Sequence, residues 1–265
     1  MTAIILLSLA LLAALAFFWV RRSAKAAFPE TLNGEYAEVL QSRVRYYQKL
    51  HPDQKIAFVK RVAAFLKQVH IEGVGTEVDL TDSILVATSA IIPIFAFGDW
   101  RYPNLTNVIL YPNTFNEEFQ FDGHGRRTMG MVGTGYMNGQ MILSKPAMYA
   151  AYTLEDTKHN TPIHEFVHLL DKTDGATDGI PENFMERRNL EPWLSLMHLE
   201  MEKIHQGNSD INPYALTGDA EFFAVVSEYF FQQPELMSRE HPEIYSMLSQ
   251  FFQRDLVNET PKLAN

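Results

Sequence analysis

The residues best suited to chemistry lie between positions 164 and 168, where the sequence reads HEFVH. On a helix, residues four apart lie on the same face, so His164 and His168 can bind one metal ion. Glu165 lies about 100° further around the helix, beside the position that the metal keeps open. Zn²⁺ lowers the pKa of its bound water to about 7, and a carboxylate can accept the proton as that water attacks a carbonyl. The pattern predicts a zinc hydrolase with Glu165 as general base.

The segment around this pentad reads as a buried helix. Asn160 can cap its start, and Pro162 suits a first helical turn. The rest of the segment is strongly apolar, and buried imidazole or carboxylate groups cost free energy unless they are paired or bound to metal. Asp171 shares the face of His164 and His168. It either orients one of the imidazoles or forms the polar end of the helix.

A third metal ligand is expected from a second apolar helix at residues 219–231. Beyond its first residue this helix carries two carboxylates, Glu221 and Glu228, which are seven apart and therefore on one face. A zinc site made of two histidines and a glutamate from another helix would explain one buried carboxylate. We predict Glu221 as the ligand and Glu228 as its supporting neighbour. The alternatives are Glu228 as the ligand, and Glu221 as an acid favoured by the helix dipole.

The two helices also resemble a known family. The matching segments are HEFVHLLD at 164–171, DG at 174–175, DGIP at 178–181 and AEFFAVVSEY at 220–229. They resemble the Mlc titration factor A family of zinc-dependent peptidases and, more distantly, the metalloprotease domain of anthrax lethal factor. The resemblance covers residues 30–255. It implies His164, His168 and Glu221 as zinc ligands and Glu165 as the catalytic base, acting on a peptide or protein substrate.

The resemblance also bears on Tyr214 and on partners. In the lethal factor pattern, a tyrosine seven residues before the ligand glutamate stabilises the oxyanion, and here that position is Tyr214. The alternative is a loop tyrosine that packs beside Pro213. The family further implies contact with a transcriptional repressor of sugar uptake. The domain would then be a regulatory binding protein with a mainly structural zinc ion, but Glu165 and Tyr214 favour catalysis because neither is needed to hold zinc.

The composition excludes several other classes of protein. The chain has 265 residues, a formal net charge of −10 and no cysteine. The negative charge and the absence of a basic stripe argue against nucleic-acid binding. Because there is no cysteine, thiolate metal ligands and a cysteine nucleophile are both excluded. Endopeptidase and aminopeptidase action both remain open.

A long apolar run begins near the N-terminus. Residues 3–20 read AIILLSLALLAALAFFWV, with Ser8 as the only polar residue. As a helix this run is about 27 Å long, close to the roughly 30 Å of a bilayer core. Arg21, Arg22 and Lys25 follow, and such a flank stays in the cytoplasm. We expect a single-pass anchor in the bacterial inner membrane with a cytoplasmic catalytic domain. The alternative is a cleaved signal peptide and a periplasmic enzyme.

These patterns define an expected architecture. The fold class is α+β: a mostly helical, zincin-like metallopeptidase domain with a small β-sheet, preceded by one N-terminal transmembrane helix. The predicted boundaries are 1–22 for the transmembrane anchor, 23–33 for a linker, 34–257 for the zinc metallopeptidase domain and 258–265 for a C-terminal tail.

Several elements that must position the site can be predicted individually. Helical spacing of apolar residues predicts helices at 35–50, 53–70 and 192–205, and a helix capped by Thr81-Asp82 and ended by Pro93. Residues 130–134 and 140–143 flank a turn with Asn138-Gly139, which predicts a hairpin. An extended substrate could pair with the edge of such a strand and lie across the zinc ion.

The remaining histidines are not expected in the site. His198 and His205 should lie on the surface of the helix at 192–205. Solvent or helix-end positions are expected for the others, which are His51, His70, His124, His159 and His241. Residues 171–181 read as a loop of Asx-turns, because they lack the spacing of a calcium-binding loop.

Overall fold

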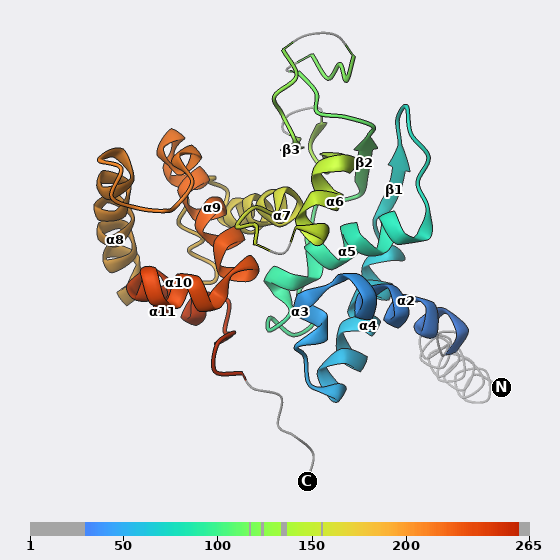
Figure 1. Ribbon diagram of the computed structural model, residues 1–265, viewed down its shortest axis with the longest axis horizontal. Coiled ribbons are helices and arrows are strands. Elements are labelled where there is room, and N and C mark those ends of the chain that lie inside the picture. The colour runs from blue at the N-terminus through green and yellow to red at the C-terminus, as the bar shows by residue number, and fades with distance from the viewer. Residues whose placement is uncertain (1–29, 117, 123–124, 134–136, 155, 260–265) are drawn as a thin grey trace, which may run out of the picture. The chain divides into compact units, whose positions relative to one another are not determined.

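A computed structural model describes residues 30–259, apart from 117, 123–124, 134–136 and 155 (Figure 1). The predicted membrane segment at 3–20, most of the predicted linker, the last residues of the predicted tail and His124 lie outside the described residues. Within the described ranges, no helix is both long and apolar enough to cross a membrane. The chain divides into two compact units, residues 1–38 and 39–265.

The expected α+β class, mostly helical with a small sheet, is confirmed. The α-helices are α2 (Glu30–Arg43), α3 (Arg45–Gln48), α4 (Pro52–Leu66), α5 (Leu80–Ile94), α6 (Lys145–Thr153), α7 (Thr161–Asp171), α8 (Arg187–His205), α9 (Asp219–Gln232), α10 (Pro234–Glu240) and α11 (Pro242–Phe251). Short 3₁₀ helices are η2 (Lys172–Asp174) and η3 (Pro213–Thr217). The strands are β1 (His70–Gly73), β2 (Asn107–Tyr111), β3 (Gly130–Val132) and β4 (Gln140–Ser144).

The four strands form one sheet in the order β1-β2-β4-β3. β1 pairs with β2 and β2 with β4 in parallel, whereas β3 runs antiparallel to β4 with Gly130 opposite Leu143. The predicted hairpin is therefore confirmed. β3 contacts α7 and is at the edge of the sheet, so one of its two sides has no strand partner among the described residues.

α7 and α9 lie side by side in the helical part of this unit (Figure 1). Buried aromatic rings hold both helices. The Phe166 ring on α7 lies 5.9 Å from that of Phe65 and 5.1 Å from that of Tyr102, and the Phe222 ring on α9 lies 6.0 Å from that of Trp193. Burial of each such side chain stabilises the fold by about 1.5–3 kcal/mol. The backbones that carry the polar site residues are thus held by aromatic packing on other sides of the two helices.

Strand pairing and backbone geometry override two of the expected helices. The helix predicted for 53–70 ends at Leu66 in α4, because His70 begins β1 and its N–H donates to the carbonyl oxygen of Thr106 at 2.8 Å. The helix predicted for 35–50 is interrupted at Val44, whose backbone is extended and whose side chain is buried. Propensity is a weak guide where tertiary contacts compete with it.

The start of α5 also differs from the prediction. Asp79, not Thr81, caps this helix: an Asp79 carboxylate oxygen accepts the N–H of Asp82, and an Asp82 oxygen accepts the N–H of Asp79, each at 2.8 Å. This reciprocal pair satisfies two backbone donors at once. Pro93 lies in the last turn, and the helix ends at Ile94.

Candidate metal centre

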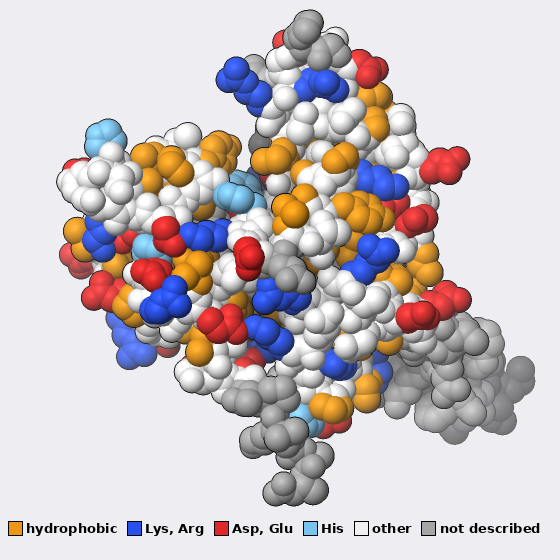
Figure 2. All heavy atoms as spheres, viewed as in Figure 1, with side chains coloured by type: hydrophobic (Ala, Val, Ile, Leu, Met, Phe, Trp, Pro, Cys, Tyr) orange, Lys and Arg blue, Asp and Glu red, His pale blue; other side chains and the backbone are white. Residues whose placement is uncertain are grey.

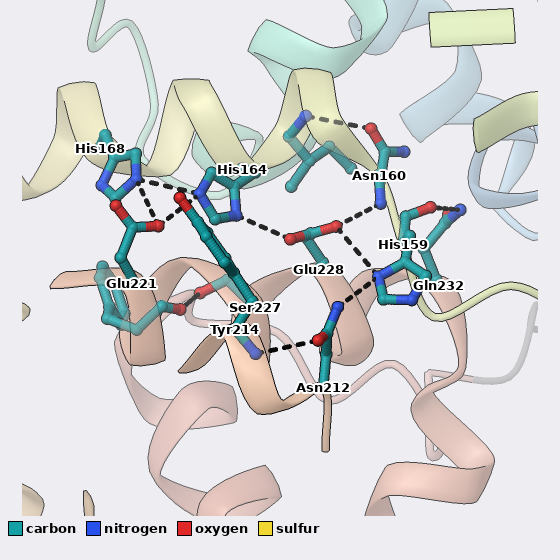
Figure 3. A network of polar contacts seen from close by, with 12 residues as sticks. His159, Asn160, His164, His168, Asn212, Tyr214, Glu221, Ser227, Glu228 and Gln232 are labelled. Carbon is teal, nitrogen blue, oxygen red and sulfur yellow. Dashed lines mark hydrogen bonds and ion pairs between the residues drawn. The ribbon is translucent and has the colours of Figure 1, made fainter. Parts of the chain in front are cut away.

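α7 and α9 bring His164, His168 and Glu221 together (Figure 3). The Nε2 atoms of the two imidazoles lie 3.0 Å apart, and Glu221 Oε2 lies 2.9 Å from His164 Nε2 and 3.4 Å from His168 Nε2. In the part of the chain that the structure describes, this is the one group of three such side chains close enough to share an ion.

The donor set suits zinc. Imidazole nitrogen and carboxylate oxygen are usual zinc ligands, and bonds of about 2.0–2.1 Å to a tetrahedral ion place neighbouring ligand atoms about 3.3 Å apart. The measured separations of 2.9–3.4 Å are close to that value. Three such protein ligands would leave the fourth position of a tetrahedral ion open, as in catalytic rather than structural zinc sites.

Glu228 supports His164 from the side away from this group. Its Oε1 lies 2.7 Å from His164 Nδ1, and its Oε2 accepts the N–H of Asn160 at 2.5 Å (Figure 3). Burial lowers the pKa of His164, but the hydrogen bonds that its ring donates to the Glu221 and Glu228 carboxylates outweigh burial and raise this pKa to about 10. In the metal-free protein, His164 therefore holds a proton that a metal ion must displace.

Glu165 is buried next to the same group, with 6% of its surface exposed. Burial raises its pKa, while His164 and His168 oppose that rise. A carboxylate with a raised pKa is better suited to accept a proton and return it near neutral pH. The edge strand comes close here: a Cβ atom added to Gly130 would lie 2.6 Å from Glu165 Oε1.

Tyr214 lies on η3, and its hydroxyl points toward His164 and Glu221 (Figure 3). Its ring centroid is 6.0 Å from that of His164, and half of its surface is exposed. Burial and the Glu221 carboxylate raise its pKa, so the phenol keeps its proton and can donate a hydrogen bond. The start of η3 is held by Asn212, whose side-chain oxygen accepts the N–H of Tyr214 at 2.9 Å.

Asp171 is fully buried, but neither imidazole is its hydrogen-bond partner. Its Oδ2 accepts the N–H of Gly179 at 2.8 Å, whereas its Oδ1 and His168 Nδ1 are both buried without a partner among the described atoms. Burial raises the Asp171 pKa to about 6, against the effect of the Gly179 hydrogen bond. Asp171 therefore fastens the loop after α7.

Other histidines are distributed partly as expected. His198 and His205 are exposed on α8. His159 is also largely exposed, although its Nδ1 lies 4.0 Å from Glu228 Oε2 and 3.5 Å from the Asn212 amide nitrogen. His241 differs most: it precedes α11, at a helix end as expected, but its side chain is buried.

His241 belongs to a partly buried polar cluster that the sequence interpretation missed: His241 and Glu200 are buried, whereas Asp210 is exposed. Its ring nitrogens lie 3.1 Å from Glu200 Oε1 and 2.6 Å from Asp210 Oδ1. A lone histidine between two short helices has no spacing that would reveal it. Glu200 did offer a signal, because it occupies the inner face of α8 with Trp193 and Met197.

Charged side chains of both signs surround the hydrophobic ones on the face shown in Figure 2. Hydrophobic side chains gather over α6 and the neighbouring strands. Two of the strongly exposed hydrophobic side chains are Met129, which directly precedes β3, and Leu154, which directly follows α6.

Comparisons with known proteins agree with the geometry. Residues 17–253 match the family of glucose-regulated metallo-peptidases M90. An uncharacterised protein of Synechocystis sp. is 30% identical over 249 residues, which cover 88% of this chain and 89% of that protein.

Two further relatives carry the name Mlc titration factor A. The one from Escherichia fergusonii is 29% identical, over 78% of this chain and 81% of its own length. The one from Salmonella gallinarum is 30% identical, over 72% of this chain and 76% of its own length. The resemblance to proteins of this name, noted from the sequence, is therefore confirmed.

Proposed function

Because the chain belongs to the Mlc titration factor A family of glucose-regulated metallo-peptidases M90, we propose that it is a zinc-dependent peptidase with Glu165 as general base. The observation that carries this proposal is the convergence of His164, His168 and Glu221 beside the buried carboxylate of Glu165. A purely structural metal site would not need a buried acid at its open side.

The residues around the site have complementary roles in this proposal. A zinc ion held by His164, His168 and Glu221 would polarise the scissile carbonyl and acidify a water molecule. Glu165 accepts the proton of the attacking water and delivers it to the departing amine. Tyr214 donates a hydrogen bond to the oxygen that becomes negative. Glu228 keeps the His164 ring oriented with Nε2 toward the site.

The edge strand offers a way to align a peptide substrate. β3 is unpaired on one side among the described residues, and Gly130 brings its backbone against Glu165. An extended peptide could add to that edge through main-chain hydrogen bonds and so present a peptide bond to the site.

Replacement of Glu165 by Gln tests the chemistry. The variant should bind zinc as the wild type does, because Glu165 is not a ligand, but peptide hydrolysis should fall by about 10²–10⁴-fold. The measurements are metal analysis of the full-length chain and cleavage of a peptide library. Glu191→Gln makes the same change on the exposed surface of α8 and should leave hydrolysis unaltered. Turnover that survives in Glu165→Gln would refute this mechanism.

A second candidate function rests on the relatives named Mlc titration factor A. Here the domain would act by sequestering a transcriptional repressor of sugar uptake, and zinc would be mainly structural. Binding of such a repressor should be equal in wild type and Glu165→Gln, whereas regulation by proteolysis should be lost in the variant.

We also propose that residues 3–20 anchor the protein in the bacterial inner membrane, with the domain on the cytoplasmic side. The support is the apolar run and its basic flank. Fractionation that recovered a shortened, soluble periplasmic form would contradict this placement.

A further inference from the structure

The segment between α8 and η3 leads to Tyr214, and Asp210 is one of the side chains that hold it to the rest of the chain. Asp210 Oδ2 accepts hydrogen bonds from Lys158 Nζ at 2.5 Å and from Tyr229 Oη at 3.0 Å, and its Oδ1 lies 2.6 Å from His241 Nε2. These partners come from the segment before α7, from α9 and from the start of α11. Asp210 thus joins the segment to three separate parts of the helical core.

His241 can make both of its contacts only as a cation. Its Nε2 faces Asp210, and its Nδ1 lies 3.1 Å from Oε1 of Glu200, a carboxylate that is 2% exposed. A neutral imidazole has one N–H, so one of the two carboxylates would then face a lone pair. Glu200 Oε1 also accepts the Ser209 hydroxyl at 2.7 Å, so the same cluster holds the segment at a second point.

We propose that His241, as an imidazolium between Asp210 and Glu200, is a positioning residue that latches the 206–212 segment and thereby holds Tyr214 over the metal centre. The inference rests on the proposed function, because Tyr214 is the oxyanion donor in that proposal. The connection is short: Asp210 is four residues before Tyr214, and Asn212 between them caps the Tyr214 backbone.

The charged surroundings of His241 indicate how the latch responds to pH. α8 contributes Glu200, which is also paired with Lys203, and the segment contributes Asp210, which is also paired with Lys158. The remaining titratable neighbours are Tyr229 on α9 and the Arg239–Glu240 ion pair at the end of α10.

Burial lowers the pKa of His241, but Glu200 and Asp210 outweigh burial and raise it above its ordinary value. Because the pKa of His241 is raised in the folded chain, its ion pairs stabilise the fold fully at pH values below its unfolded-state pKa. This stabilisation is lost as pH rises through its folded-state pKa. The latch is therefore fully closed at pH values below the ordinary histidine pKa, and it opens as pH rises through the raised pKa of His241.

Hydrogen–deuterium exchange of the full-length, zinc-loaded chain tests the latch directly. In His241→Gln and in Asp210→Asn, amides of residues 206–217 should exchange at least tenfold faster than in wild type, with zinc content unchanged. His205→Gln, an exposed histidine at the end of α8, is the matched control and should exchange like wild type. In the wild type, the amides of residues 206–217 should become less protected from exchange, relative to the amides of α4, as pH rises through the pKa of His241.

Kinetics test whether the latch acts through Tyr214. kcat for peptide cleavage in His241→Gln should fall toward that of Tyr214→Phe, which should itself lose about 10²-fold, while KM changes little. The proposal would be overturned if amide exchange in both latch variants equalled that of the wild type. It would also be overturned if exchange became faster in His241→Gln while its kcat stayed equal to that of His205→Gln. If His241→Gln does not fold, the wild-type pH series decides. If the proposed peptidase function is wrong, the wild type will cleave peptides no faster than Glu165→Gln. The hydrogen–deuterium exchange test of the latch does not depend on that result.

Discussion

Glu221 and Glu228 lie seven residues apart on one face of α9, yet they meet opposite nitrogens of His164. Glu221 faces Nε2 at 2.9 Å, where His168 also converges, whereas Glu228 faces Nδ1 at 2.7 Å and also accepts the Asn160 N–H. One imidazole thus separates a carboxylate on the metal side from a carboxylate that orients the ring.

This separation predicts different results from the two glutamate variants. Glu221→Ala removes a ligand, so the purified chain should lose its stoichiometric zinc. Glu228→Ala leaves the three proposed ligands in place, but it removes the carboxylate that orients the His164 ring and that accepts the Asn160 N–H. Zinc affinity should therefore fall by about 10–100-fold. Competition with a coloured chelator measures both. Zinc retained in Glu221→Ala but lost in Glu228→Ala would transfer the ligand role to Glu228.

At the scale of elements, Gly179 joins the loop after α7 to α8 and α9. Its N–H donates to Asp171 Oδ2 and its carbonyl oxygen accepts from Trp193 Nε1, both at 2.8 Å. Its φ is +76°, and an added Cβ atom would lie 2.3 Å from the carbonyl oxygen of Asp219. Asp219 is the first residue of α9 and is two residues before Glu221. The loop therefore sets where α9, the helix that carries the third candidate ligand, begins.

Gly179→Ala should accordingly weaken both the fold and the metal site. The left-handed backbone costs about 1 kcal/mol for alanine, and the contact with Asp219 must also be relieved by moving α9. We expect a lower midpoint of thermal unfolding and weaker zinc binding. Gly175→Ala is the control, because it has φ +104° in the same loop but no atom within 4 Å of an added Cβ. Identical behaviour of the two variants would show that the Asp219 contact does not matter.

The sequence predicts those elements that carry their own periodic pattern. α7 and α9 follow from apolar helices that each carry polar groups on one face, and the hairpin follows from a turn between two short apolar runs. The end of α4 could not be predicted, because pairing of His70 with a strand that begins 37 residues later competes with the helical pattern. The Gly179 contact and the role of Asp171 also depend on tertiary packing, which local spacing does not encode.

The candidate site shows the same division. His164, Glu165 and His168 occupy one helical turn, so their spacing reveals them, and Glu221 and Glu228 are conspicuous as acids in an apolar helix. The cluster of His241 with Glu200 and Asp210 is assembled from three elements. Of these, Glu200 alone carries a pattern, as an acid on the inner face of α8.

For the whole molecule, the metal centre ties together helices that are far apart in sequence, since 57 residues separate His164 from Glu221. A ligand that binds the folded chain alone stabilises it by mass action, by about 4 kcal/mol when its free concentration is a thousandfold above Kd. For a domain of this size, that corresponds to a rise of about 10 °C in the unfolding midpoint. Removal of zinc by a chelator should reverse this rise.

The size of this stabilisation should increase with pH. In the metal-free protein, the pKa of His164 is raised to about 10, so its ion pairs with Glu221 and Glu228 stabilise the fold fully below about pH 6.5 and are lost as pH rises toward 10. Zinc must displace that proton, so its apparent affinity rises by up to about tenfold per pH unit over the same range. The zinc-induced shift of the unfolding midpoint should therefore be larger at pH 8.5 than at pH 6.5, as scanning calorimetry with and without zinc can measure. Glu221→Ala should show little shift at either pH, and a wild-type shift that shrinks with rising pH would mean that zinc binds elsewhere.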